Sequence, residues 1–277
     1  SAPCPFPHQM CRIGGQSIPI ISVSPTLTFF AKQSSSPFAA NLATYIELDF
    51  PHITSLKARR ISLNKTLASL ISRPETSPGE KPYTVSQGGT RLDGQGYHLV
   101  PLDLRQISSL ESTLLPLLDT TLPTLFLAEC LFCYMAPKES HAVIEWFGNV
   151  FGADGAGGCM GVVYEIAGSS DGGLVGARLS GDVCAYSSLV ILLGRHEAEF
   201  DGQSHPVQTL KLTDLASFLV RGIPLPGATY KNPADQASRF LSAGYNYAEG
   251  MSMKQVRRDV IPKAELERYV PSSLNPR

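Results

Sequence analysis

Strand-like apolar runs alternate with helix-like amphipathic runs along the first part of the chain. The apolar runs predict five strands, at residues 18–24, 43–50, 96–105, 124–135 and 161–168. Helices are expected to begin near Pro51, near Ile107 and at Pro137, because proline suits a first helical turn and apolar side chains then recur at helical spacing. This alternation is typical of βαβ units, so we expect an α/β fold with a mainly parallel sheet flanked by helices.

The pattern changes between residues 169 and 209. This stretch is rich in glycine, shows no amphipathic period and surrounds one apolar run, "VCAYSSLVILLG" (183–194). We interpret 169–209 as an insertion or loop of uncertain order. Beyond it, the spacing predicts helices at 211–222 and 232–244, a sixth strand at 245–252 and a final polar helix.

Composition and charge narrow the classes of function. A chain of 277 residues with 43% hydrophobic residues can form one α/β domain with a full core. The net charge of -1 provides no basic surface for a phosphate backbone, so nucleic acid is not expected as a partner. The run at 183–194 is too short to span a bilayer and no cationic, apolar leader is visible, so we expect a soluble, cytoplasmic protein. The chain begins at Ser1 without methionine, which suggests a fragment.

The six cysteines are interpreted as thiols of a cytosolic protein rather than as a disulfide framework. Cys130 and Cys133 have the CxxC spacing of redox and metal sites, but no second pair and no suitable histidine lie near them in the sequence. Because both cysteines lie in or just after an apolar run, packing is the favoured interpretation. No metal site is expected.

Three acids, Asp49, Asp103 and Glu129, fall at or near the carboxyl ends of three successive predicted strands. In a parallel sheet they would line one edge, which is where ligands of such folds bind. Carboxylates there suit a ligand that has ribose hydroxyls, an adenine amino group and a positive centre, and S-adenosylmethionine has all three. A dinucleotide such as NAD would also use a ribose-binding acid, but its pyrophosphate needs a glycine-rich first turn.

Taken singly, an aspartate after a strand is more often a helix cap or a turn residue than a ligand. Glu129 is the strongest candidate, because an acid inside so apolar a run is costly to bury without a partner. The joint placement of the three acids therefore carries the prediction.

Four segments, "YIELDFP", "YHLVPLDLR", "PTLFLAECLFCYM" and "VVYEIAG", closely resemble the leucine carboxyl methyltransferase family in their order and spacing. The later segment "RGIPLPGATYKNPADQASRFLSAGY" also fits, so the resemblance covers about 43–168 and 211–270. Members of this family use S-adenosylmethionine to methylate the C-terminal leucine carboxylate of the protein phosphatase 2A catalytic subunit. The resemblance implies a Rossmann-like methyltransferase fold and a protein substrate.

The resemblance also implies a division of the chain and roles for individual residues. It implies one methyltransferase domain over 1–277, with a cofactor-binding half at 18–168, the insertion at 169–209 and a helical, substrate-side part at 210–277. Carried over by position, Asp49 would hold the ribose, Asp103 and Leu104 would frame the adenine, and Glu129 would face the methionine or sulfonium end of the cofactor. A monomer is expected, since no stripe at coiled-coil spacing demands a partner.

The sequence departs from the family pattern at four places. Ser24, Pro25 and Thr26 stand where the family has a glycine loop of the type LGAGxDT, and Pro25 lacks an amide hydrogen. Arg12 is not a convincing substitute for the family's N-terminal arginine, 169–209 is foreign to the pattern, and the expected closing strand is missing. The departures suggest a divergent copy or an imperfectly assembled gene model.

These departures leave other functions open. One alternative is a catalytically impaired member of the same fold, and another is a methyltransferase that acts on a different carboxylate, a small molecule or a modified tRNA base. An NAD-dependent oxidoreductase would have the same arrangement of parallel strands and ligand-binding acids, but the missing glycine turn argues against this function.

If the site is active, no general base is required, because a leucine carboxylate is already ionised at neutral pH. We therefore expect no catalytic acid or base. The cations Lys57, Arg59, Arg60 and Arg105 are expected to be solvated residues rather than substrate ligands. His98 and His141 are expected to lie on a strand surface and on a helix surface.

Overall fold

The computed structural model describes residues 18–23, 42–73, 81–153, 156–166, 187–193, 226–227, 229–230, 232–252 and 255–264. In these ranges the strands are β1 (Ile18–Val23), β2 (Leu42–Asp49), β3 (Thr84–Ser86), β4 (Arg91–Asp93), β5 (Tyr97–Pro101), β6 (Thr124–Glu129), β7 (Cys159–Ile166), β8 (Ser187–Leu193) and β9 (Tyr247–Ser252). The α-helices are α2 (Pro51–Leu63), α3 (Lys65–Leu70), α4 (Ile107–Leu114), α5 (Pro137–Phe151) and α7 (Pro233–Ser242). Shorter helical turns are η2 (Gln87–Gly89), η3 (Leu115–Leu117), η4 (Phe132–Tyr134) and η6 (Val256–Val260).

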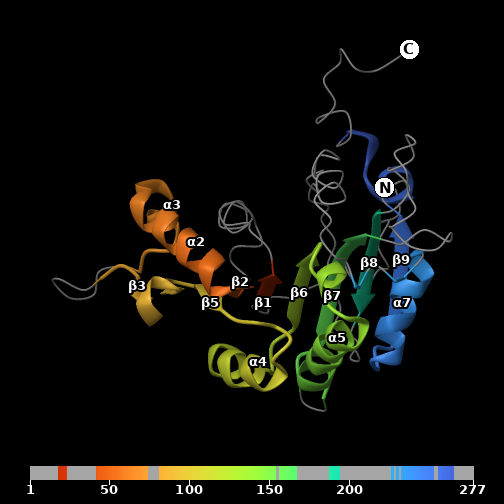
Figure 1. Cartoon of the computed structure of the whole chain (residues 1–277). Helices are drawn as coiled ribbons and strands as arrows, with labels where there is room; N and C mark the ends of the chain where they lie inside the picture. The colour runs from red at the N-terminus through yellow and green to blue at the C-terminus, as the bar shows by residue number, and fades with distance from the viewer. Residues whose placement is uncertain are drawn as a thin grey trace.

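The strands of the described ranges form one sheet in the order β3-β4-β5-β2-β1-β6-β7-β8-β9 (Figure 1). The five central strands, from β5 to β7, are parallel, and the strands outside them are added in antiparallel pairs. The chain moves outward from β1 through β2 to β5 and then continues on the other side of β1 with β6 and β7. The predicted mainly parallel α/β sheet is confirmed, and its strand order reverses at β1, where folds of this kind bind ligands.

Helices cover both faces of the sheet. Figure 1 shows α2 and α3 on one side of the strands, and α4 and α5 on the other. The alternation of side chains in β2 explains this arrangement, because Tyr45 packs in the cluster that contains Ala58 and Ile61 of α2, whereas Ile46 and Leu48 pack in the larger cluster formed with α4, α5 and α7. The core therefore consists of two apolar layers, one on each face of the sheet.

The helix starts predicted from the sequence are confirmed at Pro51, Ile107 and Pro137. The predicted strand at 124–135 is too long, because β6 ends at Glu129. Cys130 then has a φ of +47°, in the left-handed region that interrupts an extended strand, and the following residues turn into η4.

The antiparallel strands at the two sides of the sheet differ from the sequence prediction in two places. The apolar run inside 169–209 contributes β8, which pairs with β7 on one side and with β9 on the other. The β3–β4 hairpin was not predicted from the sequence at all. The remainder of 169–209 and the helix predicted at 211–222 lie outside the described residues. Within the described ranges, no helix has the length and apolar character that a membrane crossing requires.

Candidate functional site

The three predicted acids follow strands that run in the same direction. Asp49 is the last residue of β2, Glu129 is the last residue of β6, and Asp103 follows the end of β5 by two residues. Because β5, β2, β1 and β6 are adjacent and parallel, their carboxyl ends meet at one edge of the sheet (Figure 1). The structure thus brings the three acids to a common edge, on either side of β1. The first turn, Ser24, Pro25 and Thr26, lies outside the described residues.

The half-buried Asp49 lies directly before α2. Its Oδ1 accepts a hydrogen bond of 2.7 Å from the backbone N–H of Phe50. The helix then begins at Pro51, whose missing N–H is not needed in a first turn. Only Phe50 separates the strand from the helix, so the Asp49 carboxylate lies between the end of β2 and the start of α2.

Asp103 is engaged by a cation two residues away. Arg105 donates from Nε to Oδ1 at 2.9 Å and from Nη2 to Oδ2 at 2.7 Å, and its backbone N–H also reaches Oδ1 at 3.1 Å. The hydrogen bond from Arg105 lowers the pKa of Asp103, so the carboxylate stays ionised. Leu104 between them is buried and belongs to the core. The exposed Arg105 guanidinium lies 5.9 Å from the ring centroid of Phe50, next to Asp49.

Glu129 has a different environment from the two aspartates. Its side chain is partly buried, and burial raises the pKa of its carboxyl. Among the described residues, none forms a hydrogen bond or an ion pair with this carboxylate. A partly desolvated acid with no counterion in the described part of the chain suits a cationic ligand, because the ligand would supply an opposite charge.

The turn that follows Glu129, residues Cys130–Met135, is held by a carboxylate from β7. Glu165 accepts hydrogen bonds from the backbone N–H groups of Leu131, Phe132 and Cys133, at 2.9, 2.5 and 3.0 Å. These amides open η4 and have no acceptor within it. Glu165 is only 2% exposed; burial raises the pKa of its carboxyl, and the three amides oppose that rise.

A second buried acid lies two residues before Asp49. Glu47 forms an ion pair with Lys57 of α2 and accepts a hydrogen bond of 2.8 Å from the Tyr97 hydroxyl. The expectation that Lys57 would be solvated is therefore wrong, because the lysine side chain is only 18% exposed and lies against the sheet. This ion pair joins α2 to β2 below the edge that carries Asp49.

The two cysteines of the CxxC spacing lie in the turn after Glu129. Cys133 is buried and Cys130 is half-buried. Burial, with a smaller contribution from Glu165, raises the pKa of Cys130 to about 12 and raises that of Cys133 further. Both thiols are therefore protonated at neutral pH and act as packing groups, which confirms the packing interpretation.

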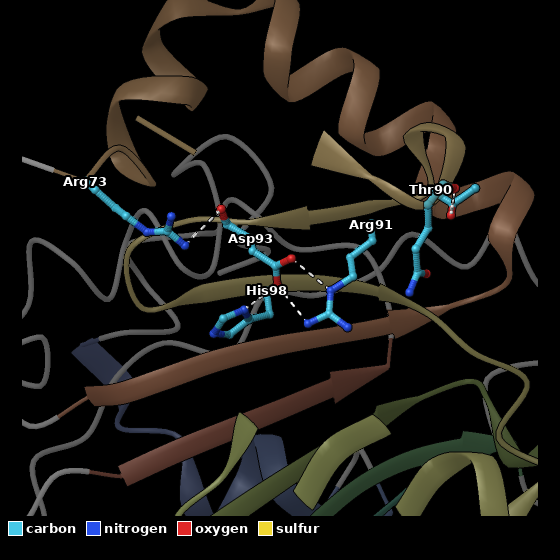
Figure 2. A network of polar contacts seen from close by, with 6 residues as sticks. Arg73, Thr90, Arg91, Asp93 and His98 are labelled. Atoms are coloured by element: carbon cyan, nitrogen blue, oxygen red, sulfur yellow. Dashed lines mark hydrogen bonds and ion pairs between the residues drawn. The ribbon is translucent and has the colours of Figure 1, made fainter. Parts of the chain in front are cut away.

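His98 belongs to a polar cluster on β4 and β5 (Figure 2). Asp93 accepts from Arg91 at 2.8 and 3.1 Å, and its Oδ1 lies 2.7 Å from Nδ1 of His98. Figure 2 shows both side chains pointing toward the Asp93 carboxylate, and Arg73 reaching the Asp93 backbone oxygen. His98 is near the start of β5, away from its carboxyl end. This cluster therefore stabilises the pairing of β4 with β5 and does not belong to the candidate site.

Comparison with known proteins shows which family the chain is similar to. Residues 35–148 match the family model described as Leucine carboxyl methyltransferase. Leucine carboxyl methyltransferase 1 of Cryptococcus neoformans is 35% identical over 257 residues, which cover 87% of this chain and 60% of that protein. The chain is therefore similar to the leucine carboxyl methyltransferase family over residues 35–148 and, at 35% identity, over most of its own length. In Yarrowia lipolytica, a leucine carboxyl methyltransferase 1 is 27% identical over 92% of this chain and 63% of its own length.

The chain spans about 60% of the length of the curated family member that it matches in Cryptococcus neoformans. Solved structures resemble the chain as well, and PigF and RosA are two of them. PigF with SAH matches with a TM-score of 0.40 and 9% identity, over 82% of this chain and 45% of PigF. A riboflavin-derivative dimethyltransferase, RosA from Streptomyces davawensis, matches with a TM-score of 0.38 and 8% identity, over 83% of this chain and 44% of RosA.

The family match at 35–148 includes Asp49, Asp103 and Glu129, whereas Glu165 lies outside it. Sequence reasoning identified Glu129 as an acid in an apolar run, but it did not apply the same argument to Glu47 in "YIELDF" or to Glu165 in "VVYEIAG". The apolar residues around both acids already indicate burial, and a buried acid in a strand needs a partner. The partners themselves come from α2 and from the turn after β6, which the sequence does not place.

Proposed function

We propose that the chain binds S-adenosylmethionine at the carboxyl edge of β2, β5 and β6 and transfers its methyl group to the α-carboxylate of a C-terminal leucine. The proposed protein substrate is the catalytic subunit of protein phosphatase 2A, as the family resemblance implies. One observation carries the proposal: the segment that matches the family model delivers Asp49, Asp103 and Glu129 to one edge of a parallel sheet, at the strand where its order reverses.

The residues at this edge fit the parts of the proposed cofactor. Asp49, which ends β2, would accept hydrogen bonds from the ribose hydroxyls. Asp103, kept ionised by Arg105, would accept from the adenine amino group beside the apolar Leu104. Glu129, partly buried without a counterion in the described part of the chain, would lie at the methionine and sulfonium end.

The reaction makes modest demands on protein chemistry. Bound S-adenosylmethionine supplies an electrophilic methyl group on a positively charged sulfur. A leucine carboxylate is ionised at neutral pH and needs no general base. The chain has to align one carboxylate oxygen with the methyl carbon and remove water from the nucleophile. This explains why the proposal assigns no catalytic acid or base.

Transfer of a radiolabelled methyl group to a synthetic peptide tests the proposal. The peptide carries the C-terminal sequence of the phosphatase catalytic subunit, and a matched peptide has the same sequence with an amidated C-terminus. We expect base-labile label on the free carboxylate only, with loss of transfer in Glu129→Gln. The matched variant Glu111→Gln, an exposed acid on α4, should transfer normally.

Equal labelling of both peptides would overturn the assignment of the C-terminal carboxylate as the acceptor. Absence of label, in a chain that binds S-adenosylmethionine, would point to another acceptor or to a catalytically impaired member of the fold.

A further inference from the structure

The turn Cys130–Met135 connects Glu129 to α5, and three consecutive amides within it converge on one acceptor. Three consecutive N–H groups, from Leu131 to Cys133, donate to the carboxylate of Glu165. Glu165 comes from the neighbouring strand, one residue beyond Tyr164, which pairs with Glu129 in the β6–β7 register. The acid that holds the turn is thus fixed next to the strand end that carries Glu129.

A buried cation also packs against this turn. Arg239 of α7 is 4% exposed, and its guanidinium lies 5.4 Å from the ring centroid of Phe132. It donates to Gln236 Oε1 at 2.8 Å and to Ser140 Oγ at 2.5 Å, and its charge interacts with that of Glu165. Burying two opposite charges around a six-residue turn costs free energy that an ordinary surface loop does not require. The cost implies that the position of this turn is important.

The backbone of a third segment also packs on the turn. Gly227 donates its N–H to the carbonyl of Cys133 at 3.0 Å. A Cβ at this position would lie 1.8 Å from the carbonyl oxygen of Phe132 and 2.7 Å from that of Met135. Only glycine permits this approach, so a side chain at 227 would have to push the turn away.

We infer that Glu165 is a positioning residue of the cofactor site: by holding the turn Cys130–Met135, it sets the position of Glu129 for binding S-adenosylmethionine. This inference rests on the proposed function. Glu165 does not need to contact the cofactor, because its carboxylate acts through the amides of the turn. Cys130, in its left-handed conformation, is the link between that turn and Glu129.

Glutamine is the sharpest substitution at this position. Glu165→Gln keeps the length and volume of the side chain but replaces one acceptor oxygen with an NH₂ donor. The NH₂ group would replace either the oxygen that accepts from Cys133 or the oxygen that accepts from Leu131 and Phe132. In either orientation at least one buried amide N–H would face a donor and lose its acceptor. Glu249→Gln, an exposed acid on β9 in the same sheet, is the matched control.

Two measurements on the full chain test the inference. The first is hydrogen–deuterium exchange of a peptide that covers 130–136, without cofactor. The second is calorimetric titration with S-adenosylmethionine of the wild type, Glu165→Gln, Glu129→Gln and the double variant. We expect Glu165→Gln to speed exchange in this peptide and to weaken binding severalfold, up to the loss of about tenfold expected for Glu129→Gln. Because Glu165 acts through Glu129, the double variant should bind about as weakly as Glu129→Gln alone.

Each outcome decides a separate point. Wild-type affinity in a folded Glu165→Gln chain, or a double variant that loses the full sum of both single effects, would overturn the inference and leave the proposed function intact. A folded wild type that does not bind S-adenosylmethionine would overturn both. Should Glu165→Gln fail to fold, Gly227→Ala displaces the same turn from the other side, and wild-type affinity in that variant would overturn the inference.

Discussion

Glu129 and Glu165 are the same residue type on neighbouring parallel strands, but their surroundings give them different roles. Glu165 is fully buried and is satisfied by three backbone amides, so its charge is used inside the protein. Glu129 is partly buried and has no hydrogen-bonding or ion-pair partner among the described residues. Glu165 therefore holds a turn, whereas the surroundings of Glu129 are those expected of the proposed cofactor-binding acid.

The environment of Glu129 predicts the pH dependence of cofactor binding. Burial raises the pKa of Glu129, and its ionised form is the one that would attract the sulfonium of the proposed cofactor. Affinity for S-adenosylmethionine should therefore fall as the pH decreases through that raised pKa, at a higher pH than an ordinary glutamate would cause. Calorimetric titrations between about pH 8 and about pH 5 measure this fall.

In Glu129→Gln we expect affinity to decrease about tenfold at neutral pH and this part of the pH dependence to disappear. Glu111→Gln, with an exposed acid on α4, should keep the wild-type profile. A Glu129→Gln chain with the wild-type profile would show that another group titrates with binding.

At the scale of elements, the periodicity of the sequence predicts the central strands and the helix starts, because both depend on local apolar spacing and on proline. The strand ends are less predictable. β6 was expected to continue to residue 135, but its end depends on the backbone of Cys130 and on amides that reach Glu165 some 30 residues later. The β3–β4 hairpin was missed because its strands have three residues each, too few to show a period.

β8 is an internal strand of the sheet, and this has a testable consequence. It pairs with both β7 and β9, so each of its amides faces a neighbouring strand. Val190→Pro removes one of these donors, and we expect the free energy of unfolding to fall at least about 2 kcal/mol further than in Val190→Ala. Urea denaturation measures both variants. Equal stability of the two, within about 0.5 kcal/mol, would contradict the pairing of β8.

The polar cluster on β4 and β5 predicts the response of the protein to acid. Burial alone would raise the pKa of Asp93, but hydrogen bonds from His98 and Arg91 outweigh it and lower the pKa from 3.8 to about 2. The ionised aspartate therefore contributes stability above about pH 4, and this contribution is lost as the pH falls toward 2. The lowered pKa corresponds to at most roughly 2.5 kcal/mol of stability when this contribution is completely lost.

In Asp93→Asn this part of the acid dependence should be absent, so the free energy of unfolding would change less between pH 4 and 2 than in the wild type. Urea denaturation at several pH values measures the difference. Glu145→Gln, which changes an exposed acid on α5, is the control and should follow the wild type. An identical loss of stability in Asp93→Asn would place the acid sensitivity elsewhere.

At the scale of the whole molecule, the strand order brings together residues that are far apart in the sequence. Asp49, Asp103 and Glu129 come from three strands around β1 and could be predicted as a set, because parallel strands share one carboxyl edge. The supports of that edge could not be predicted. Glu165 and Arg239 reach the turn after Glu129 from β7 and α7, through contacts that depend on the assembled sheet and helices.

The central claim is that this edge binds S-adenosylmethionine, and calorimetric titration of the purified wild-type chain and of Asp49→Ala tests it most directly. We predict saturable binding by the wild type and a loss of at least about tenfold in affinity for Asp49→Ala, because the ribose hydroxyls would lose their acceptor. Circular dichroism should show that both chains are folded. A folded wild type that shows no binding, or an Asp49→Ala chain that binds equally well, would contradict the account.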